Sequence, residues 1–230
     1  MLFLLVLCLC FTAVGAAFAE TTATEAPAAE KPVAEMTAEE LYQAAKEAAG
    51  VEDYGKALEY LQLAADLGNA GGLRGIGYLY TMGLGVEQDY DKALEYYQLA
   101  ADKGDTGAMI NIGLMYGNGI GVEQDYGKEL EYFRKAADLG DADALGYIGI
   151  MYVKGLGVEQ DYGKALEYYQ KAADLGNAWV LCNIGMLYDE GDGVEQDYGK
   201  ALEYYQKGTG TAERHADAGV YEAGRAGEQK

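Results

Sequence analysis

The stretch from Asp161 to Gln196 reads DYGKALEYYQKAADLGNAWVLCNIGMLYDEGDGVEQ, and close copies of it fill most of the chain. The copies begin every 36 residues, at Asp53, Asp89, Asp125 and Asp161, and a fifth begins at Asp197. A fixed period of this length is typical of solenoids, in which each repeat packs only on its neighbours. The sequence therefore predicts one repeated supersecondary unit.

The first half of the copy has helical spacing, and we call it helix B. Ala165, Tyr169 and Ala172 lie at i, i+4 and i+7, which gives one apolar stripe on a helix of about three turns. Asp161 occupies the N-cap position, where its carboxylate accepts a backbone N–H. Gly176 follows the helix, where a glycine commonly ends it.

The second half predicts another helix, from about 178 to 189, which we call helix A. Its pattern L-x2-I-G-x2-Y is carried by Leu181, Ile184, Gly185 and Tyr188. A glycine inside a helix costs about 0.5–1 kcal/mol relative to alanine. The same slot nevertheless holds Gly77, Gly113, Gly149 and Gly185. We infer a close helix–helix contact there, and the G-x-G-V turn that follows completes an αα-hairpin.

These motifs resemble the Sel1-like repeat family, a branch of the tetratricopeptide-like superfamily. L-x2-I-G-x2-Y is similar to the tetratricopeptide signature W-x2-L-G-x2-Y, with leucine in place of tryptophan. The 36-residue period, the G-x-G-V turn and the K-A-x-x-Y-Y-x-K-A-A run favour the Sel1-like subtype. The resemblance implies an all-α fold, a right-handed α-solenoid of αα-hairpins over residues 38–230, with 208–230 as a degenerate C-terminal cap.

The N-terminal segment differs in composition from the repeats. Residues 2–18 are almost wholly apolar and Ala17-Phe18-Ala19 offers a cleavage site, which predicts a signal peptide over residues 1–19. The segment has no Lys or Arg, so an uncleaved membrane anchor stays open as the alternative. Residues 20–37 have the composition of a disordered linker. We expect a capping box at 37–40 and an exported protein, periplasmic or secreted.

Composition argues against catalysis and against nucleic acid as a ligand. The net charge of −21 repels phosphate backbones. The chain contains no serine, which excludes the usual hydrolase triad, and its single histidine, His215, lies in the degenerate last repeat. Cys182 alone would remain after cleavage, so no intramolecular disulfide is expected. No His/Cys cluster has metal-ligand spacing, and Asp189 to Gly193 lacks the ligand order of a calcium loop. We expect no catalytic residue, no metal and no cofactor.

Helix A varies among the copies on one stripe, while the packing positions around it hardly change. In the Sel1-like family, helix A lines the concave face, so the resemblance implies a partner-binding surface there. Transferred by position, it comprises Arg74, Tyr78, Met82, Ile110, Leu114, Asn118, Asp143, Ile150, Lys154, Trp179, Cys182, Met186 and Glu190. The predicted apolar centre is Leu114, Ile150 and Met186.

Two functions of different class follow. The first is a monomeric extracytoplasmic scaffold that binds a protein or peptide along this face. The second, by analogy with activities suggested for some Sel1-like proteins, is a cell-envelope hydrolytic enzyme or an enzyme-regulating factor. The missing serine and the isolated His215 weigh against the second.

Overall fold

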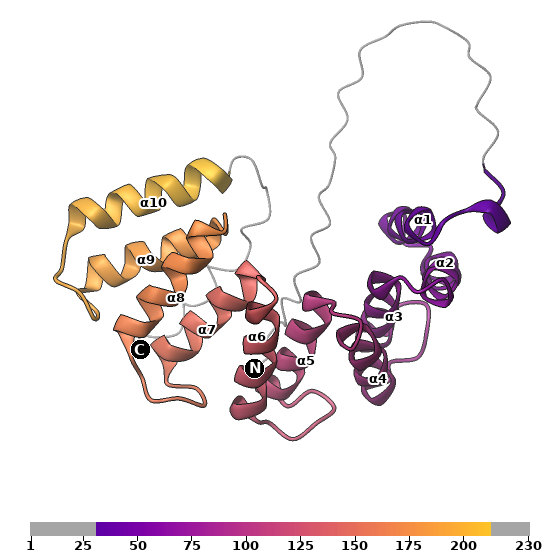
Figure 1. Cartoon of the computed structure of the whole chain (residues 1–230), viewed down its shortest axis with the longest axis horizontal. Helices are drawn as coiled ribbons and strands as arrows, with labels where there is room; N and C mark the ends of the chain where they lie inside the picture. The colour runs from indigo at the N-terminus through magenta and orange to yellow at the C-terminus, as the bar shows by residue number, and fades with distance from the viewer. Residues whose placement is uncertain (1–30, 213–230) are drawn as a thin grey trace, which may run out of the picture. The chain divides into compact units, whose positions relative to one another are not determined.

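The repeat unit folds into pairs of antiparallel helices, as the periodicity predicts. The computed structural model describes residues 31–212 (Figure 1). A short 3₁₀ helix spans Val33–Glu35. The α-helices are α1 (Ala38–Gly50), α2 (Tyr54–Asp66), α3 (Ala70–Met82), α4 (Tyr90–Ala101), α5 (Thr106–Asn118), α6 (Tyr126–Asp138), α7 (Ala142–Lys154), α8 (Tyr162–Asp174), α9 (Trp179–Glu190) and α10 (Tyr198–Ala212). The described residues contain helices and turns but no strand, which confirms the all-α fold class.

Helix A of the successive copies is α3, α5, α7 and α9, and helix B is α2, α4, α6, α8 and α10. The predicted signal peptide, most of the linker and His215 lie outside the described residues. Among residues 31–212, no helix combines the length and the apolar character that crossing a membrane requires.

Each helix B begins at its aspartate, as expected. The Asp161 side chain accepts the backbone N–H of Lys164 at 2.9 Å, and Asp53, Asp89, Asp125 and Asp197 make the same bond. Gly176, directly after the C-cap of α8, has a φ of 90°. The capping box is also present, since Thr37 and Glu40 bond reciprocally at the start of α1. The predicted helix boundaries are therefore confirmed by specific caps.

The chain divides into two compact units, and the division falls within α7. In the described residues, one unit contains α1 to α6, the first residues of α7 and residues 156–158. The other contains the rest of α7 together with α8, α9 and α10. Sequential helices pack against each other within each unit, from α1 through α6 and from α8 through α10. This neighbour-by-neighbour packing is that of a solenoid.

The core is built from the positions that do not vary. The isoleucines of the L-x2-I-G motif, Ile76, Ile112, Ile148 and Ile184, are at most 1% exposed. Next to each lies a helix A glycine that an aromatic ring of helix B covers. A Cβ on Gly149 would lie 2.6 Å from Cδ1 of Tyr169, and Gly77, Gly113 and Gly185 face Tyr97, Phe133 and Tyr205 in the same way. The glycines thus mark close helix contacts, as predicted.

Candidate interaction face

The predicted partner-binding residues all lie on helix A, but their environments fall into three groups. Met82, Asn118, Lys154, Met186 and Glu190 are exposed. Arg74, Tyr78, Leu114, Asp143, Ile150, Trp179 and Cys182 are half-buried. Ile110 is only 8% exposed, so it offers little surface to a partner. The difference follows position along the helix, because Arg74 and Trp179, in the first turns of their helices, contact a neighbouring repeat.

Arg74, in the second turn of α3, is held by residues on both sides of its repeat, one in α1 and one at the start of α5. Its guanidinium forms an ion pair with Asp105, with 2.9 Å between Nε and Oδ1, and Nη2 donates to the Tyr42 hydroxyl at 3.3 Å. Burial opposes the charge of Arg74, but Asp105 and Tyr42 outweigh it, so its pKa is raised above the ordinary value. Asp105 also caps α5 by accepting the N–H of Ala108 at 2.7 Å. Arg74 therefore stabilises the packing of neighbouring repeats.

The Arg74 side chain also lies over a glycine of the next helix A. A Cβ on Gly107 would come within 3.1 Å of Cδ of Arg74, and one on Gly71 would come within 3.1 Å of the Tyr42 ring. In both contacts a large side chain of one repeat fills the space above a glycine in the repeat that follows. At this contact between neighbouring repeats, a large side chain on one helix A therefore faces a glycine on the next.

Trp179 makes the same kind of contact in the reverse direction. Its ring lies over Gly146 of α7, where a Cβ would sit 2.6 Å from Cη2, and its centroid is 5.8 Å from that of Tyr147. Gly146 occupies the position in α7 that Arg74 occupies in α3. Trp179 occupies the position in α9 that Gly107 occupies in α5. The large and the small residue have therefore exchanged places. Part of the variation on the stripe is therefore explained by complementary packing between neighbouring repeats.

Cys182 lies against the last helix of the described chain. A Cβ on Gly208 of α10 would be 2.9 Å from the cysteine Sγ. Burial raises the pKa of the thiol above its ordinary value, which keeps it protonated at neutral pH. A protonated, half-buried thiol is a weak nucleophile, so the geometry favours packing over reactivity at this position.

The surface that remains consists of two positions in each helix A, one turn apart. We call it the helix A face; it comprises Tyr78, Met82, Leu114 and Asn118 in one compact unit, and Ile150, Lys154, Met186 and Glu190 in the other. Met82 and Met186 are 46% and 37% exposed, unusually high for methionine. In the second unit, the positions of Ile150 and Met186 are apolar, and one turn further along their helices Lys154 and Glu190 carry opposite charges. Its continuity with Leu114 across the two units stays a prediction.

Tyrosines pack each helix A on the helix B that follows it in the chain. The rings of Tyr188 and Tyr204 stack with their centroids 5.8 Å apart, and the pairs Tyr80–Tyr96, Tyr116–Tyr132 and Tyr152–Tyr168 stack likewise. A helix B lysine lies over each helix A ring, as Lys200 does at 5.1 Å from the Tyr188 centroid. Stacked rings with a lysine on the outer face contribute about 0.5–1.5 kcal/mol beyond burial. These tyrosines are packing residues.

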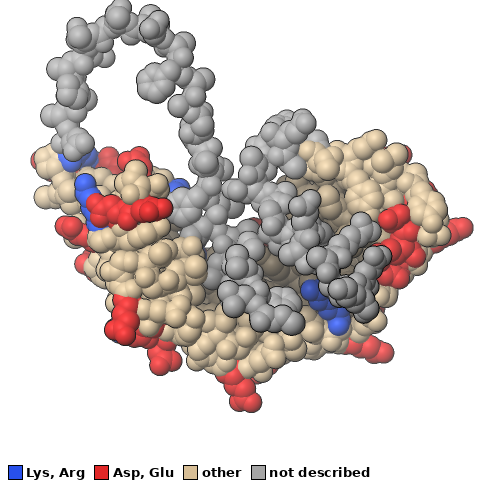
Figure 2. Space-filling model, turned by 180° about the vertical axis from the view of Figure 1, so that it is seen from behind, with Lys and Arg blue, Asp and Glu red and all other residues tan. Residues whose placement is uncertain are grey.

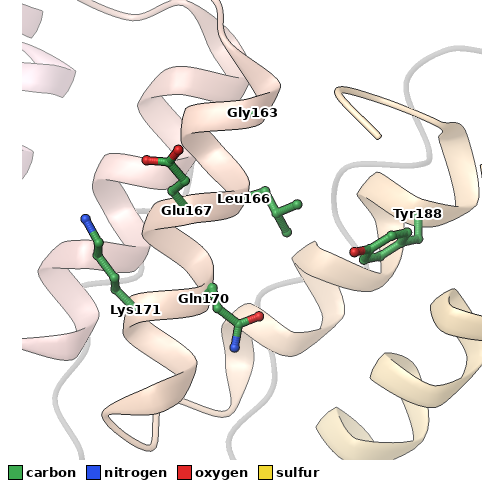
Figure 3. A pocket seen from close by; sticks show the side chains of 6 residues that line it. All are labelled: Gly163, Leu166, Glu167, Gln170, Lys171 and Tyr188. Carbon is green, nitrogen blue, oxygen red and sulfur yellow. The ribbon is translucent and has the colours of Figure 1, made fainter. Parts of the chain in front are cut away.

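A hollow of about 560 Å³ adjoins one of these stacks, between α8 and α9. In Figure 3, Leu166 and Gln170 of α8 point toward Tyr188 of α9, while Glu167 and Lys171 point away. Gln170 accepts a hydrogen bond from Tyr204 at 3.4 Å and donates one to Asp174 at 3.1 Å. The described residues include no group of three or more His, Cys, Asp or Glu side chains placed to hold a metal ion. The hollow therefore has the character of a gap between packed helices.

Acidic side chains cover far more of the face shown in Figure 2 than basic ones. The excess of acidic residues in the sequence is thus also seen on this face of the described residues. Such a surface attracts basic partners and repels polyanions.

The fold and this face define the class: an α-solenoid of αα-hairpin repeats with exposed, variable positions on one helix of each hairpin. A Sel1 repeat family model matches residues 41–69, 71–105, 106–141, 142–177 and 180–209, so the chain belongs to the Sel1 repeat family. The resemblance seen in the sequence is thereby confirmed. Sel1 repeat proteins are generally scaffolds for protein–protein interaction.

Solved structures support the same fold. A Sel1 repeat protein from Oxalobacter formigenes is 34% identical with a TM-score of 0.67, over 74% of this chain and 69% of that one. The protective antigen c5321 of uropathogenic Escherichia coli is 32% identical with a TM-score of 0.63; the match covers 77% of this chain but only 42% of that protein. Immunity protein Pa5087 from Pseudomonas aeruginosa is 29% identical with a TM-score of 0.57, over 78% and 67%. A comparison with curated protein sequences found no match.

Proposed function

We propose that this chain is an extracytoplasmic scaffold that binds a protein or peptide on the helix A face. The observation that carries the proposal is the contrast within helix A. Ile76, Ile112, Ile148 and Ile184 do not change and are buried, whereas Tyr78, Leu114, Ile150 and Met186, two residues further on, change in every copy and reach solvent. A repeated frame with changing exposed side chains is how repeat proteins acquire a specific binding surface.

The composition of the face supports a protein ligand. Methionine, isoleucine and tyrosine side chains that reach solvent on a rigid helix are suited to anchor an apolar side chain of a partner. The immunity protein among the similar structures supports a protein as the ligand class. The alternative is a hydrolytic enzyme, which would need a nucleophile paired with a base. The residues of the helix A face do not supply such a pair.

Capture from the native envelope or secreted fraction tests the proposal. The bait is the mature chain, compared with the same chain carrying Ile150→Glu and Met186→Glu. The matched control carries Leu139→Glu and Leu175→Glu, since these leucines are 58% and 57% exposed and lie at the ends of α6 and α8 rather than on the face. We expect one protein that the wild type and the control retain and the face variant loses. Equal capture by all three baits would contradict the proposed face.

Export is part of the same proposal, and intact mass tests it. We expect the mature protein from its native host to begin at Glu20, because the Ala17-Phe18-Ala19 site lies directly beyond the apolar run. A membrane-bound product that retains Met1 would favour the uncleaved anchor instead.

A further inference from the structure

Helix A of the fourth copy ends with negative charges that the earlier copies lack. Glu190 is its last residue, and Asp192 follows in the turn. The third copy has Lys154 and Leu156 at these two positions. The first two copies are uncharged there, with Met82 and Leu84 in one and Asn118 and Ile120 in the other. The two carboxylates are therefore a feature of the fourth copy and not of the repeat.

These carboxylates do not serve the fold. Glu190 lies in the last turn of α9, where the backbone carbonyl groups carry partial negative charge and a carboxylate is unfavourable. Asp192 stands at the position of Leu84, which packs on the core cluster of the first copy. Residues that break a local rule of folding without a gain in packing are typical of functional positions.

Both carboxylates lie beside the start of α8. The turn after α9 packs on Tyr162, because a Cβ on Gly193 would lie 2.6 Å from the Cβ of the tyrosine. Burial and the nearby carboxylate of Asp192 raise the pKa of the Tyr162 hydroxyl above its ordinary value, and Glu190 contributes to the same shift. The two negative charges therefore act at one place. We call Tyr162, Glu190 and Asp192 the acidic corner.

No ion pair within the described residues neutralises the acidic corner. Lys164 and Lys200 pair instead with the aspartate caps of their own helices, with 3.3 and 3.7 Å between Nζ and Oδ2. The ion pairs of residues 31–212 include neither Glu190 nor Asp192. Because Glu190 is exposed and Asp192 is half-buried, their charge is available to a partner.

The acidic corner adjoins the apolar part of the helix A face. Met186 lies one turn before Glu190 on α9 and is 37% exposed. Ile150 has the equivalent position in α7, within the same compact unit, and α7 touches α9 where Trp179 lies over Gly146. A partner segment on this part of the face would therefore meet apolar side chains and, one turn further along α9, carboxylates.

We propose that the partner contributes a segment in which an apolar side chain, seated on Met186 and Ile150, is followed by a lysine or arginine that binds at the acidic corner. This inference rests on the proposed function and names the chemistry of the partner. A cation placed beside two carboxylates makes charge-assisted hydrogen bonds, and such complementarity sets specificity and the association rate. A second copy of the chain does not match this site, because copies with a net charge of −21 repel each other.

Selection from a random peptide library tests this inference. Dodecapeptides displayed on phage are selected on the full chain, and those that also bind the Ile150→Glu, Met186→Glu variant are discarded. The peptides that remain depend on the helix A face. We expect them to combine apolar residues with lysine or arginine, because the acidic corner repels acidic side chains.

A second step exchanges the acidic corner for the residues of the preceding copy. Glu190→Lys with Asp192→Leu introduces the residues that the third copy has at the same positions, so the repeat frame tolerates them. The matched control, Glu167→Lys with Glu203→Leu, makes the same change in charge at exposed positions of helix B. We expect the selected peptides to bind the corner variant at least about fivefold more weakly, and the control with wild-type affinity. Raising the salt concentration from about 0.05 M to about 0.5 M should reduce this difference.

The outcomes separate this inference from the proposed function. Face-dependent peptides that are acidic or uncharged, or that bind the corner variant as tightly as the wild type, would overturn the inference and leave the helix A face as the binding site. A selection that yields no face-dependent peptide would count against the helix A face itself, and the inference would fall with it.

Discussion

Where neighbouring repeats of this protein touch, the sizes of the contacting residues are complementary. The clearest case is a pair of equivalent contacts in which the large and the small residue are exchanged. In one contact Arg74 lies over Gly107 of the later repeat, and in the other Trp179 lies over Gly146 of the earlier repeat. A glycine in one repeat allows a large side chain in the other, and two large residues at one contact would collide. The interior of a folded protein is close-packed, so such pairs respond to substitution together.

This coupling is measurable as a double-mutant cycle. Gly146→Ala should destabilise the protein, because the added Cβ would overlap the Trp179 ring, with Cη2 at 2.6 Å, and would lie 2.9 Å from Cγ1 of Val180. In a Trp179→Ala background the same change should cost less, with a coupling free energy of about 0.5–3 kcal/mol in urea denaturation. Additive effects within error would show that the two side chains do not share this contact.

The glycine row gives a second residue-scale prediction, with its control in the next helix. Gly149→Ala should lower the free energy of unfolding by about 1–3 kcal/mol, because the Cβ would overlap the buried Tyr169 ring. Gly163→Ala should leave stability unchanged or raise it by about 0.5 kcal/mol, since a Cβ there meets only Asp161 Oδ1 at 3.3 Å. Thermal denaturation of both variants measures these two changes in stability. If Gly149→Ala were as stable as Gly163→Ala, the close contact would be absent.

At the scale of the helix, boundaries are set by side chains that repeat with the period. At three of the helix B caps, the hydrogen bond from the backbone N–H three residues on lowers the pKa of the aspartate below its ordinary value of 3.8; these are Asp89, Asp161 and Asp197. Their stabilisation is therefore fully present above pH 3.8 and is lost as the pH falls through the lowered pKa values.

The triple variant Asp89→Asn, Asp161→Asn and Asp197→Asn tests this cap chemistry. Asparagine still accepts the capping bond but does not titrate, so the variant should lose less stability on acidification than the wild type. The quantity compared between the variant and the wild type is the slope of the thermal midpoint against pH below 3.8. Thermal unfolding is monitored by the helical circular dichroism signal. Identical slopes would mean that these aspartates keep their ordinary pKa values in the folded protein.

Helices, caps and the glycine row could be predicted from one copy of the repeat. Asp161, Gly176 and Gly149 act through neighbours within a hairpin, and the 36-residue period repeats the same signal in each copy. The role of Arg74 and Trp179 could not be read from the stripe alone, because packing and binding both produce variable positions. A signal was present in the pairing of large and small residues 33 positions apart, at 74 and 107 and at 146 and 179.

For the whole molecule, the period predicts the solenoid but not the division within α7. Neither α7 nor its neighbours depart from the repeat pattern in a way that marks the boundary. The identity of the partner is also beyond the pattern, because it depends on the few side chains of the helix A face rather than on the frame. Those side chains, Ile150 and Met186 above all, are the place to test function.

The affinity of the captured partner for the face variant tests the central claim most directly. Ile150→Glu with Met186→Glu places one carboxylate at a half-buried position and one at an exposed position, and leaves Ile148, Gly149, Ile184 and Gly185 unchanged. In isothermal titration we expect at least a tenfold weaker Kd, about 1.4 kcal/mol, with helical circular dichroism unchanged and with wild-type affinity for the Leu139→Glu, Leu175→Glu control. An unchanged Kd for the face variant would contradict the account and place the partner on another surface.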